Sequence, residues 1–322
     1  MKTILFPFAI FALSCTPALA LEPSATPDAA GSEADADSVE PVSADALMVT
    51  SSGPDMNPPE SLPVPPPAEP YRLSTFSRQA KSVRWEVLAA ASAITATRLA
   101  DVTTGGSGFH FKNEGWFGKS TYSLGMDKMH HAWKTYVITD VMESIIRRRT
   151  GEKAGAAKTG AIISLGLLTY GEIMDGFTAR TGFSNQDMTV HLAGAGLSLL
   201  RNTVPGLRDK LDFRMEFKPT FGAEGLHLVD QLEKRKYFVS AQLSGFKRTR
   251  DTPWRFLELH MGYYARGFSD RSKLAGEPQK RRVFLGLGFN VQALFSRQPK
   301  SRIERYAKGM LDYVQIPYTL VN

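Results

Sequence analysis

The chain has 322 residues, one cysteine and a formal net charge of +7, and 43% of its residues are hydrophobic. A single cysteine cannot close a disulfide within the chain, so a disulfide-stapled scaffold is excluded. An aromatic content of 10% excludes a wholly disordered chain. Residues 71–322 hold 38 of the 39 basic residues and 22 of the 32 acidic residues, a net charge of +16. The part of the chain that can fold is therefore strongly basic.

Residues 1–20 have the pattern of a secretory signal peptide. Lys2 gives a positive start, a short apolar run follows, and Ala18-Leu19-Ala20 matches the small-x-small cleavage pattern. We expect cleavage after Ala20, which removes Cys15. The alternative is lipidation of Cys15, because the residues before it loosely resemble a lipoprotein processing site. Both alternatives predict an exported, envelope-associated protein of the periplasm.

Residues 21–70 are predicted to form a disordered tether. They contain ten acidic residues, no Lys or Arg, and eleven of the nineteen prolines, including Pro65-Pro66-Pro67. This composition prevents helix formation and a packed core and favours an extended spacer. We interpret the segment as an inert acidic spacer; the alternative is an arm that folds back on the basic part of the chain.

Residues 71–208 are predicted to form a helical domain. Four helices are expected, at about residues 83–102, 126–149, 154–177 and 184–200. Ser184 with Asp187 three residues later is an N-terminal capping signal, and three arginines before Gly151 suit a helix C-terminus. Several glycines in these helices would allow close helix contacts, as in membrane bundles. We expect a bundle that rests on a membrane or partly enters it.

Residues 209–322 change to a period of two. Leu211, Phe213, Met215 and Phe217 alternate with charged residues, as in a half-buried strand. Similar runs follow at about residues 237–243, 257–263 and 283–291, and Val314 to Val321 is a fifth candidate strand. The sequence therefore predicts an α+β fold: a small bundle of about four helices, followed by an antiparallel meander of four or five strands that packs against the bundle.

Titratable side chains interrupt three of the predicted helices in pairs three or four residues apart. The six candidates, which lie on otherwise apolar helices, are Asp127, His131, Glu172, Asp175, Asp187 and His191. Short connections predict antiparallel neighbouring helices, which would bring the three pairs to the same end of the bundle. Lys128 and Tyr136, on the same helix as the first pair, are candidates for binding a polar group.

Three interpretations of this polar centre are open. The first is a network of ion pairs and hydrogen bonds that fixes the register of the bundle, because buried charges are costly unless they are paired. The second is a divalent metal site for zinc, iron or manganese, with ligands among His131, Glu172, Asp175, Asp187 and His191. The third is acid–base catalysis or recognition of a polar head group, with Asp187 orienting His191 and Lys128 supplying positive charge.

Several short segments resemble a known family. They include Gly125-Met126-Asp127-Lys128-Met129-His130-His131-Ala132, Glu172-Ile173-Met174-Asp175-Gly176-Phe177, Gly182-Phe183-Ser184, and Gly262-Tyr263-Tyr264-Ala265-Arg266-Gly267-Phe268. In this combination the chain resembles the YfiM-like family of predicted periplasmic lipoproteins over roughly residues 120–295, and more distantly it is similar to VanZ-like membrane proteins. It departs from the family's pattern at His191, where Asn is expected. The resemblance implies a connection with the cell envelope and no particular reaction.

The sequence predicts an exported cell-envelope protein that acts as a membrane-associated structural or binding protein. The alternative is an enzyme that acts on an envelope lipid or glycan through the Asp/His/Glu candidates, with or without a divalent metal as cofactor. The basic charge of an exported chain predicts a membrane surface or an anionic envelope polymer as its partner rather than nucleic acid.

Overall fold

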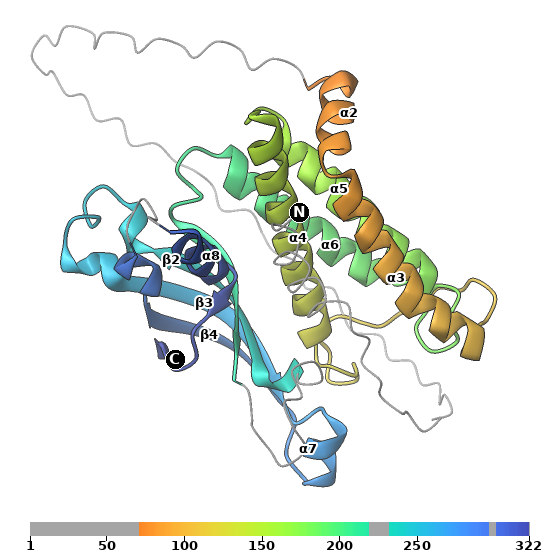
Figure 1. Ribbon diagram of the computed structural model, residues 1–322. Helices are drawn as coiled ribbons and strands as arrows, with labels where there is room; N and C mark the ends of the chain where they lie inside the picture. The colour runs from red at the N-terminus through yellow and green to blue at the C-terminus, as the bar shows by residue number, and fades with distance from the viewer. Residues whose placement is uncertain (1–70, 219–231, 296–300, 322) are drawn as a thin grey trace, which may run out of the picture. The chain divides into compact units, whose positions relative to one another are not determined.

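Helices form the first part of the described chain and strands the second, as the ribbon of the computed structural model shows (Figure 1). The structure describes residues 71–218, 232–295 and 301–321. The predicted signal peptide and tether, residues 1–70, lie outside the described residues.

Five helices precede the sheet. They are α2 (Leu73–Ser82), α3 (Arg84–Gly105), α4 (Met126–Thr150), α5 (Ala156–Asp175) and α6 (Asn185–Thr203). The four predicted helices are confirmed as α3 to α6, and α2 is additional. It is separated from α3 at Val83, whose ψ of 14° departs from helical geometry. The predicted ends of two helices are also confirmed: Ser184 Oγ accepts the Asp187 N–H at 3.2 Å, and Gly151, with φ of +72°, closes α4.

The described residues contain one sheet of six strands in the order β5-β1-β2-β3-β4-β6. The strands are β1 (Leu211–Phe217), β2 (Arg235–Gln242), β3 (Leu257–Arg266), β4 (Lys280–Phe289), β5 (Val314–Gln315) and β6 (Leu320–Val321). The predicted antiparallel meander is confirmed for β1 to β4. Two short helices that the sequence did not reveal, α7 (Asp270–Leu274) and α8 (Arg302–Leu311), lie between the later strands.

The prediction of four or five antiparallel strands needs correction, because the sheet has six strands and is mixed. Val314 to Val321 is not one strand: β5 pairs parallel with β1, and β6 pairs antiparallel with β4 at the other edge of the sheet. Pro317 has no backbone N–H to donate, and Tyr318 has a φ of +69°, so the chain turns between the two strands. This turn of residues 316–319 joins the two edges of the sheet, which is therefore curled.

Helix α4 lies between the other helices and the sheet (Figure 1). On its sheet side, Trp133, Tyr136 and Val137 form one apolar core with Phe213 and Tyr237. On its other side, α4 shares a second core with α3 and α5. Because both sides of α4 are buried, its 25 residues show little of the one-sided apolar pattern of a surface helix.

Ion pairs link the helices to the polar face of the sheet. Arg201 of α6 donates to Asp140 Oδ1 of α4 at 3.3 Å and to Asp212 Oδ1 of β1 at 2.5 Å. Arg214 of β1 donates to Asp212 and to both oxygens of Glu258, at 3.0 and 2.9 Å. Every one of these side chains is buried, so removing one partner would leave an uncompensated charge inside the protein.

His260 is buried on the same face of the sheet as this network. Its ring lies 4.8 Å from the Phe238 ring, and neither ring nitrogen has a hydrogen-bond partner among the described residues. Glu258 and Arg214 are its charged neighbours, with Glu258 Oε2 3.7 Å from Nε2. Burial, with the charge of Arg214 in addition, lowers the pKa of His260 to about 4.

We expect His260→Gln to reduce the loss of stability in acid. The unfolded chain binds the proton near pH 6.5 and the folded chain only near 4, so the folded state loses stability as the pH falls through this window. Between pH 6.5 and 4.5 the native chain should lose about 2 kcal/mol more than the variant. Urea unfolding at several pH values measures this; parallel pH profiles would contradict it.

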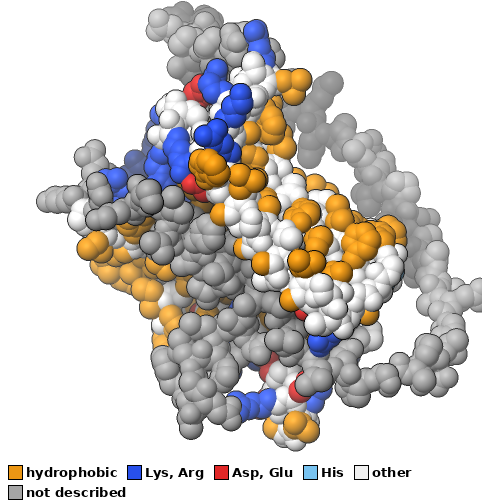
Figure 2. All heavy atoms as spheres, turned by 45° about the vertical axis from the view of Figure 1, so that its right-hand side comes forward, with side chains coloured by type: hydrophobic (Ala, Val, Ile, Leu, Met, Phe, Trp, Pro, Cys, Tyr) orange, Lys and Arg blue, Asp and Glu red, His pale blue; other side chains and the backbone are white. Residues whose placement is uncertain are grey.

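No helix in the described ranges has both the length and the apolar composition that crossing a membrane requires. Apolar side chains are nevertheless present on the surface. Figure 2, turned toward the right-hand side of Figure 1, shows hydrophobic side chains gathered over the helices, with Lys and Arg side chains beside them. The exposed apolar residues of the helices include Trp85, Leu88, Leu99 and Ile162.

Candidate functional site

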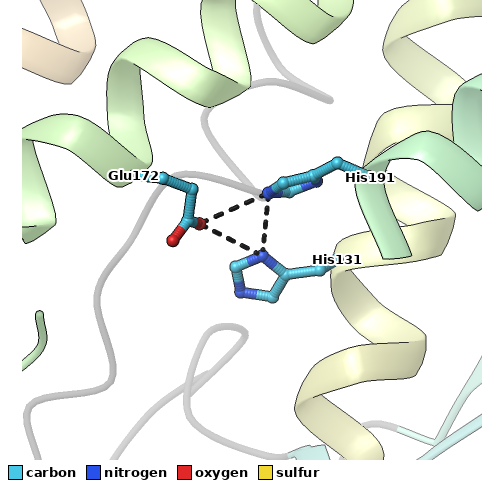
Figure 3. Close-up of side chains that lie close together, drawn as sticks. All are labelled: His131, Glu172 and His191. Atoms are coloured by element: carbon cyan, nitrogen blue, oxygen red, sulfur yellow. Dashed lines mark hydrogen bonds and ion pairs between the residues drawn. The ribbon is translucent and has the colours of Figure 1, made fainter. Parts of the chain in front are cut away.

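Three helices bring five of the six candidate residues together at one end of the bundle. The N-terminal turns of α4 carry Asp127 and His131, those of α6 carry Asp187 and His191, and the last turn of α5 carries Glu172. Figure 3 shows the side chains of His131, Glu172 and His191 pointing toward one another from these three helices. The alternation of helix direction places all three pairs at the same end, as the sequence predicted.

Three donor atoms form a small triangle. His191 Nε2 lies 3.3 Å from Glu172 Oε1 and 3.3 Å from His131 Nδ1, and His131 Nδ1 lies 3.7 Å from Glu172 Oε1. Glu172 and His191 are buried, whereas His131 is half-buried. His131 is thus the most exposed of the three.

The other nitrogen of each imidazole has its own partner. Thr135 Oγ1 donates to the His131 carbonyl oxygen at 2.7 Å, so it accepts from Nδ1–H of His191 at 2.6 Å. His131 Nε2 lies 3.4 Å from Asp127 Oδ1, one turn earlier on α4. These contacts orient both rings and leave His191 Nε2 and His131 Nδ1 facing Glu172.

Lys128 neutralises the carboxylates beside this triangle. Its side chain is only 3% exposed, and its Nζ donates to Asp187 Oδ1 at 2.8 Å, to Asp127 Oδ2 at 3.2 Å, and to Glu114 Oε2. Burial opposes the charge on Lys128, but the carboxylates of Asp127 and Asp187 outweigh burial and raise its pKa. Lys128 therefore stays charged and is fully engaged inside the centre.

The two histidines differ in their protonation. Burial and the charge of His131 lower the pKa of His191 to about 2, so this imidazole is neutral. Burial also acts against protonation of His131, but Asp127 and Asp187 raise its pKa above the ordinary value. Burial raises the pKa of Glu172, which the charge of His131 partly offsets.

Two further carboxyl groups complete the electrostatics of the centre. Burial, with Asp187 and Asp127 adding to it, raises the pKa of Glu114 to about 7. Asp187 shows the reverse: burial alone would raise its pKa, but His131 and Lys128 hold it below the ordinary value. Negative charge in the centre is thus concentrated on Asp187 and Asp127.

Asp175 and Tyr136 lie apart from the triangle. Asp175 Oδ1 accepts from Arg98 Nε at 2.9 Å, and burial raises its pKa to about 6. Its backbone carbonyl accepts from Thr178 and Thr181, so it organises the end of α5. Tyr136 is buried on the sheet side of α4, with its ring 6.0 Å from the Arg201 guanidinium. Neither side chain faces the triangle.

Two residues that shape the centre, Thr135 and Glu114, were not among the predicted site residues, whereas Gly194 is one of the helix glycines expected to allow close contacts. Thr135 could have been found, because it lies one turn after His131 on the same face of α4. Glu114 comes from the loop between α3 and α4 and carries no spacing signal. Gly194 lets α6 approach α4 closely, because a Cβ at this position would lie 2.1 Å from the Ala132 carbonyl oxygen.

The arrangement offers two sets of metal-ligand atoms. His131, Glu172 and His191 form one, and Asp127, His131 and Asp187 form the other, each with donor atoms within 4.8 Å of one another. In the second set, Asp127 and Asp187 already accept hydrogen bonds from Lys128. The first set has no Lys or Arg partner among the described residues, and it is therefore the better candidate for holding a cation.

The described chain is an α+β protein with a buried histidine–carboxylate centre in its helices. Residues 113–203, which contain the whole centre, match the model of a family described as "Predicted periplasmic lipoprotein (DUF2279)". This description agrees with the expected localisation: the chain is exported, periplasmic and associated with the envelope. The match covers α4 to α6 and not the strands, and the YfiM-like and VanZ-like relationships stay predictions. Neither the curated proteins nor the solved structures gave a match.

Proposed function

We propose that the chain is a membrane-associated binding protein of the cell envelope whose helical bundle binds one divalent transition-metal ion. His131 Nδ1, Glu172 Oε1 and His191 Nε2 are its proposed ligands. The observation that carries this proposal is the spacing of the three donor atoms, at 3.3, 3.3 and 3.7 Å. Donors about 2.1 Å from a metal ion at tetrahedral angles lie about 3.4 Å apart, so the triangle needs little movement to close around an ion.

The hydrogen bonds behind the ligands support the same interpretation. Metal-binding histidines usually donate their second ring N–H to a carboxylate or another acceptor, which fixes the tautomer. Asp127 serves His131 in this way, and Thr135 serves His191. Two histidines with one carboxylate are a donor set that suits zinc, iron or manganese.

Glu172 differs from the other buried carboxylates of the helices in its ion-pair partners. Buried carboxylates elsewhere in the helices have a Lys or Arg partner: Asp187 has Lys128, Asp175 has Arg98, and Asp140 has Arg201. Glu172 is buried, and its ion-pair partners in the described chain are the two histidines, of which His191 is neutral. A divalent ion would compensate the Glu172 charge and use the free lone pair of His191.

Metal content and affinity test the proposal. We expect purified protein, stripped with EDTA and titrated calorimetrically with Zn²⁺ and Mn²⁺, to bind one ion per chain. Glu172→Gln keeps the side-chain shape and removes a ligand, so it should abolish stoichiometric binding. Thr135→Val keeps all three ligands, removes the hydrogen bond behind His191 together with the one to the His131 carbonyl oxygen, and should weaken binding about 10- to 100-fold.

His110→Gln is the matched control, because His110 lies outside the centre and contacts Ser107 and Gly108. It should bind the metal as the native chain does. Circular dichroism of each variant separates loss of a ligand from loss of the fold. A folded native chain that shows no saturable binding of either ion would refute the metal site and leave the ion-pair network as the role of these residues.

A further inference from the structure

The outward face of the last strands is apolar and exposed over a continuous area. Its seven side chains, which are between 43 and 76% exposed, are Leu259, Met261, Val283, Leu285, Leu287, Phe289 and Val321. The strand register makes them neighbours: Leu259 is opposite Leu287, Met261 is opposite Leu285, and Leu287 is opposite Val321. Large contiguous apolar patches on the surface of a protein often mark sites of interaction with another protein or a membrane.

A basic pocket lies at the beginning of β4. A cavity of about 270 Å³ is lined by Lys119, Lys280, Arg281 and Arg282, together with Leu124 and Gln279. None of the four cations forms an ion pair with a carboxylate in the described part of the chain. Four unpaired cations around one cavity provide both the charge and the donors that a phosphate group requires.

The pocket and the apolar face are continuous. Side chains alternate along β4, so Arg281 lies on the same face as Val283 and Leu285, while Lys280 and Arg282 belong to the other face and line the pocket from there. The Arg281 guanidinium donates to the Phe117 carbonyl oxygen, and the Phe117 ring packs 5.2 Å from the Tyr263 ring, opposite Val283. An anion in the pocket would therefore lie at the edge of the apolar face.

The other end of the face carries aromatic rings and a further cation. Phe256 stacks on Phe289, with ring centroids 5.7 Å apart, and Arg255 lies over the Phe256 ring. Trp254 beside them is exposed. Aromatic rings with Lys and Arg beside an apolar surface are typical of segments at the membrane–water interface.

We propose that this surface binds the leaflet of an anionic phospholipid membrane, with a lipid phosphate in the pocket of Lys119, Lys280, Arg281 and Arg282 and acyl chains against the apolar face of β3, β4 and β6. The inference rests on the membrane-associated part of the proposed function and is independent of the metal site. The helices seen in Figure 2 also expose apolar side chains, but two of their cations are already paired, Arg78 with Glu152 and Arg149 with Glu86.

Vesicle flotation tests this surface. The chain from Leu21 onward, which the expected cleavage after Ala20 leaves and which lacks both Cys15 and the apolar run of the signal peptide, is mixed with vesicles of phosphatidylcholine alone or with 30% phosphatidylglycerol at 0.15 M salt. We expect binding to the anionic vesicles only. Lys280→Gln with Arg282→Gln should weaken this binding roughly 20- to 30-fold, because each cation near an anionic surface contributes about a factor of five. Leu285→Glu should abolish it.

The control variants make the same kinds of substitution on the helices, away from the proposed surface. Arg84→Gln with Arg148→Gln removes two exposed cations from the helices, and Leu73→Glu places a charge at an exposed leucine of α2. Both should bind as the native chain does, before and after EDTA treatment. The proposal would be overturned if the control variants lost as much binding, or if the native chain bound neutral vesicles equally well. It would also be overturned if millimolar inorganic phosphate displaced the chain while Leu285→Glu had no effect. A native dimer that Leu285→Glu converts to a monomer would overturn it too, because a second copy would then cover the face.

Discussion

Replacing Arg201 with Ala should lower the free energy of unfolding by about 3–5 kcal/mol. Arg201 is the cation between Asp140 and Asp212, which are 0% and 1% exposed, and its Nε also donates to the Leu211 carbonyl oxygen at 2.7 Å. Burial opposes its charge, but Asp212 and Asp140 raise its pKa. Without Arg201, Asp140 and Asp212 would stay buried with less compensating positive charge. This lowers the free energy of unfolding far more than the loss of a solvent-exposed ion pair does. Urea unfolding followed by tryptophan fluorescence measures the change.

Arg78→Ala is the matched control for a surface pair. Arg78 lies 2.7 Å from Glu152, but its side chain is largely exposed, so its loss should change stability by less than about 0.5 kcal/mol. If the two variants lost similar stability, Arg201 could not be the residue that holds the helices to the sheet.

Gly194→Ala should destabilise the chain and also damage the metal site. The added Cβ would lie 2.1 Å from the Ala132 carbonyl oxygen and 3.0 Å from Thr135 Cβ, both on α4. Helix α6 would have to move away, at a cost of about 1–3 kcal/mol. His191 is one turn from Gly194 on the same helix, so its distance to His131 would also increase. Thermal unfolding and metal titration measure the two effects.

Gly196→Ala provides the comparison within the same helix. A Cβ at Gly196 meets no atom within 4 Å, so alanine there should stabilise α6 by about 0.5–1 kcal/mol through its better helix propensity. Metal binding should be unchanged. If Gly194→Ala lowers stability and Gly196→Ala raises it, the loss at Gly194 comes from its close packing and not from a general effect of replacing glycine. Stability changes of the same sign would contradict this explanation.

The sequence predicted the helices and their polar ends well because these features are local. Ser184 and Gly151 act within a few residues of the helices they cap or close. The pairs Asp127 with His131 and Asp187 with His191 were visible as four-residue spacings. What could not be predicted is which partner each group finds across the fold. Asp175 is close to Glu172 in sequence but pairs with Arg98 of α3.

The sheet shows a different limit of sequence patterns. Alternation identifies two faces of a strand but does not say which face is covered. In β1 both faces are buried, one against α4 and the other in the network of Arg214 and Asp212. In β4 the side of Phe284 and Gly288 is buried, while Val283 and Leu285 on the other side are exposed. The same alternation therefore occurs in a strand buried on both faces, β1, and in a strand with an exposed apolar face, β4.

Leu124 connects two regions of the molecule that have been treated separately. It lines the basic pocket, its carbonyl oxygen accepts from Tyr263 of β3, and it immediately precedes the turn into α4, where Lys128 and His131 follow. A ligand in the pocket and an ion in the bundle would thus act on one short stretch of backbone. If the ion changes lipid affinity by some factor, thermodynamic linkage requires the lipid to change ion affinity by the same factor. Occupancy of the bundle would then report whether the protein is on a membrane.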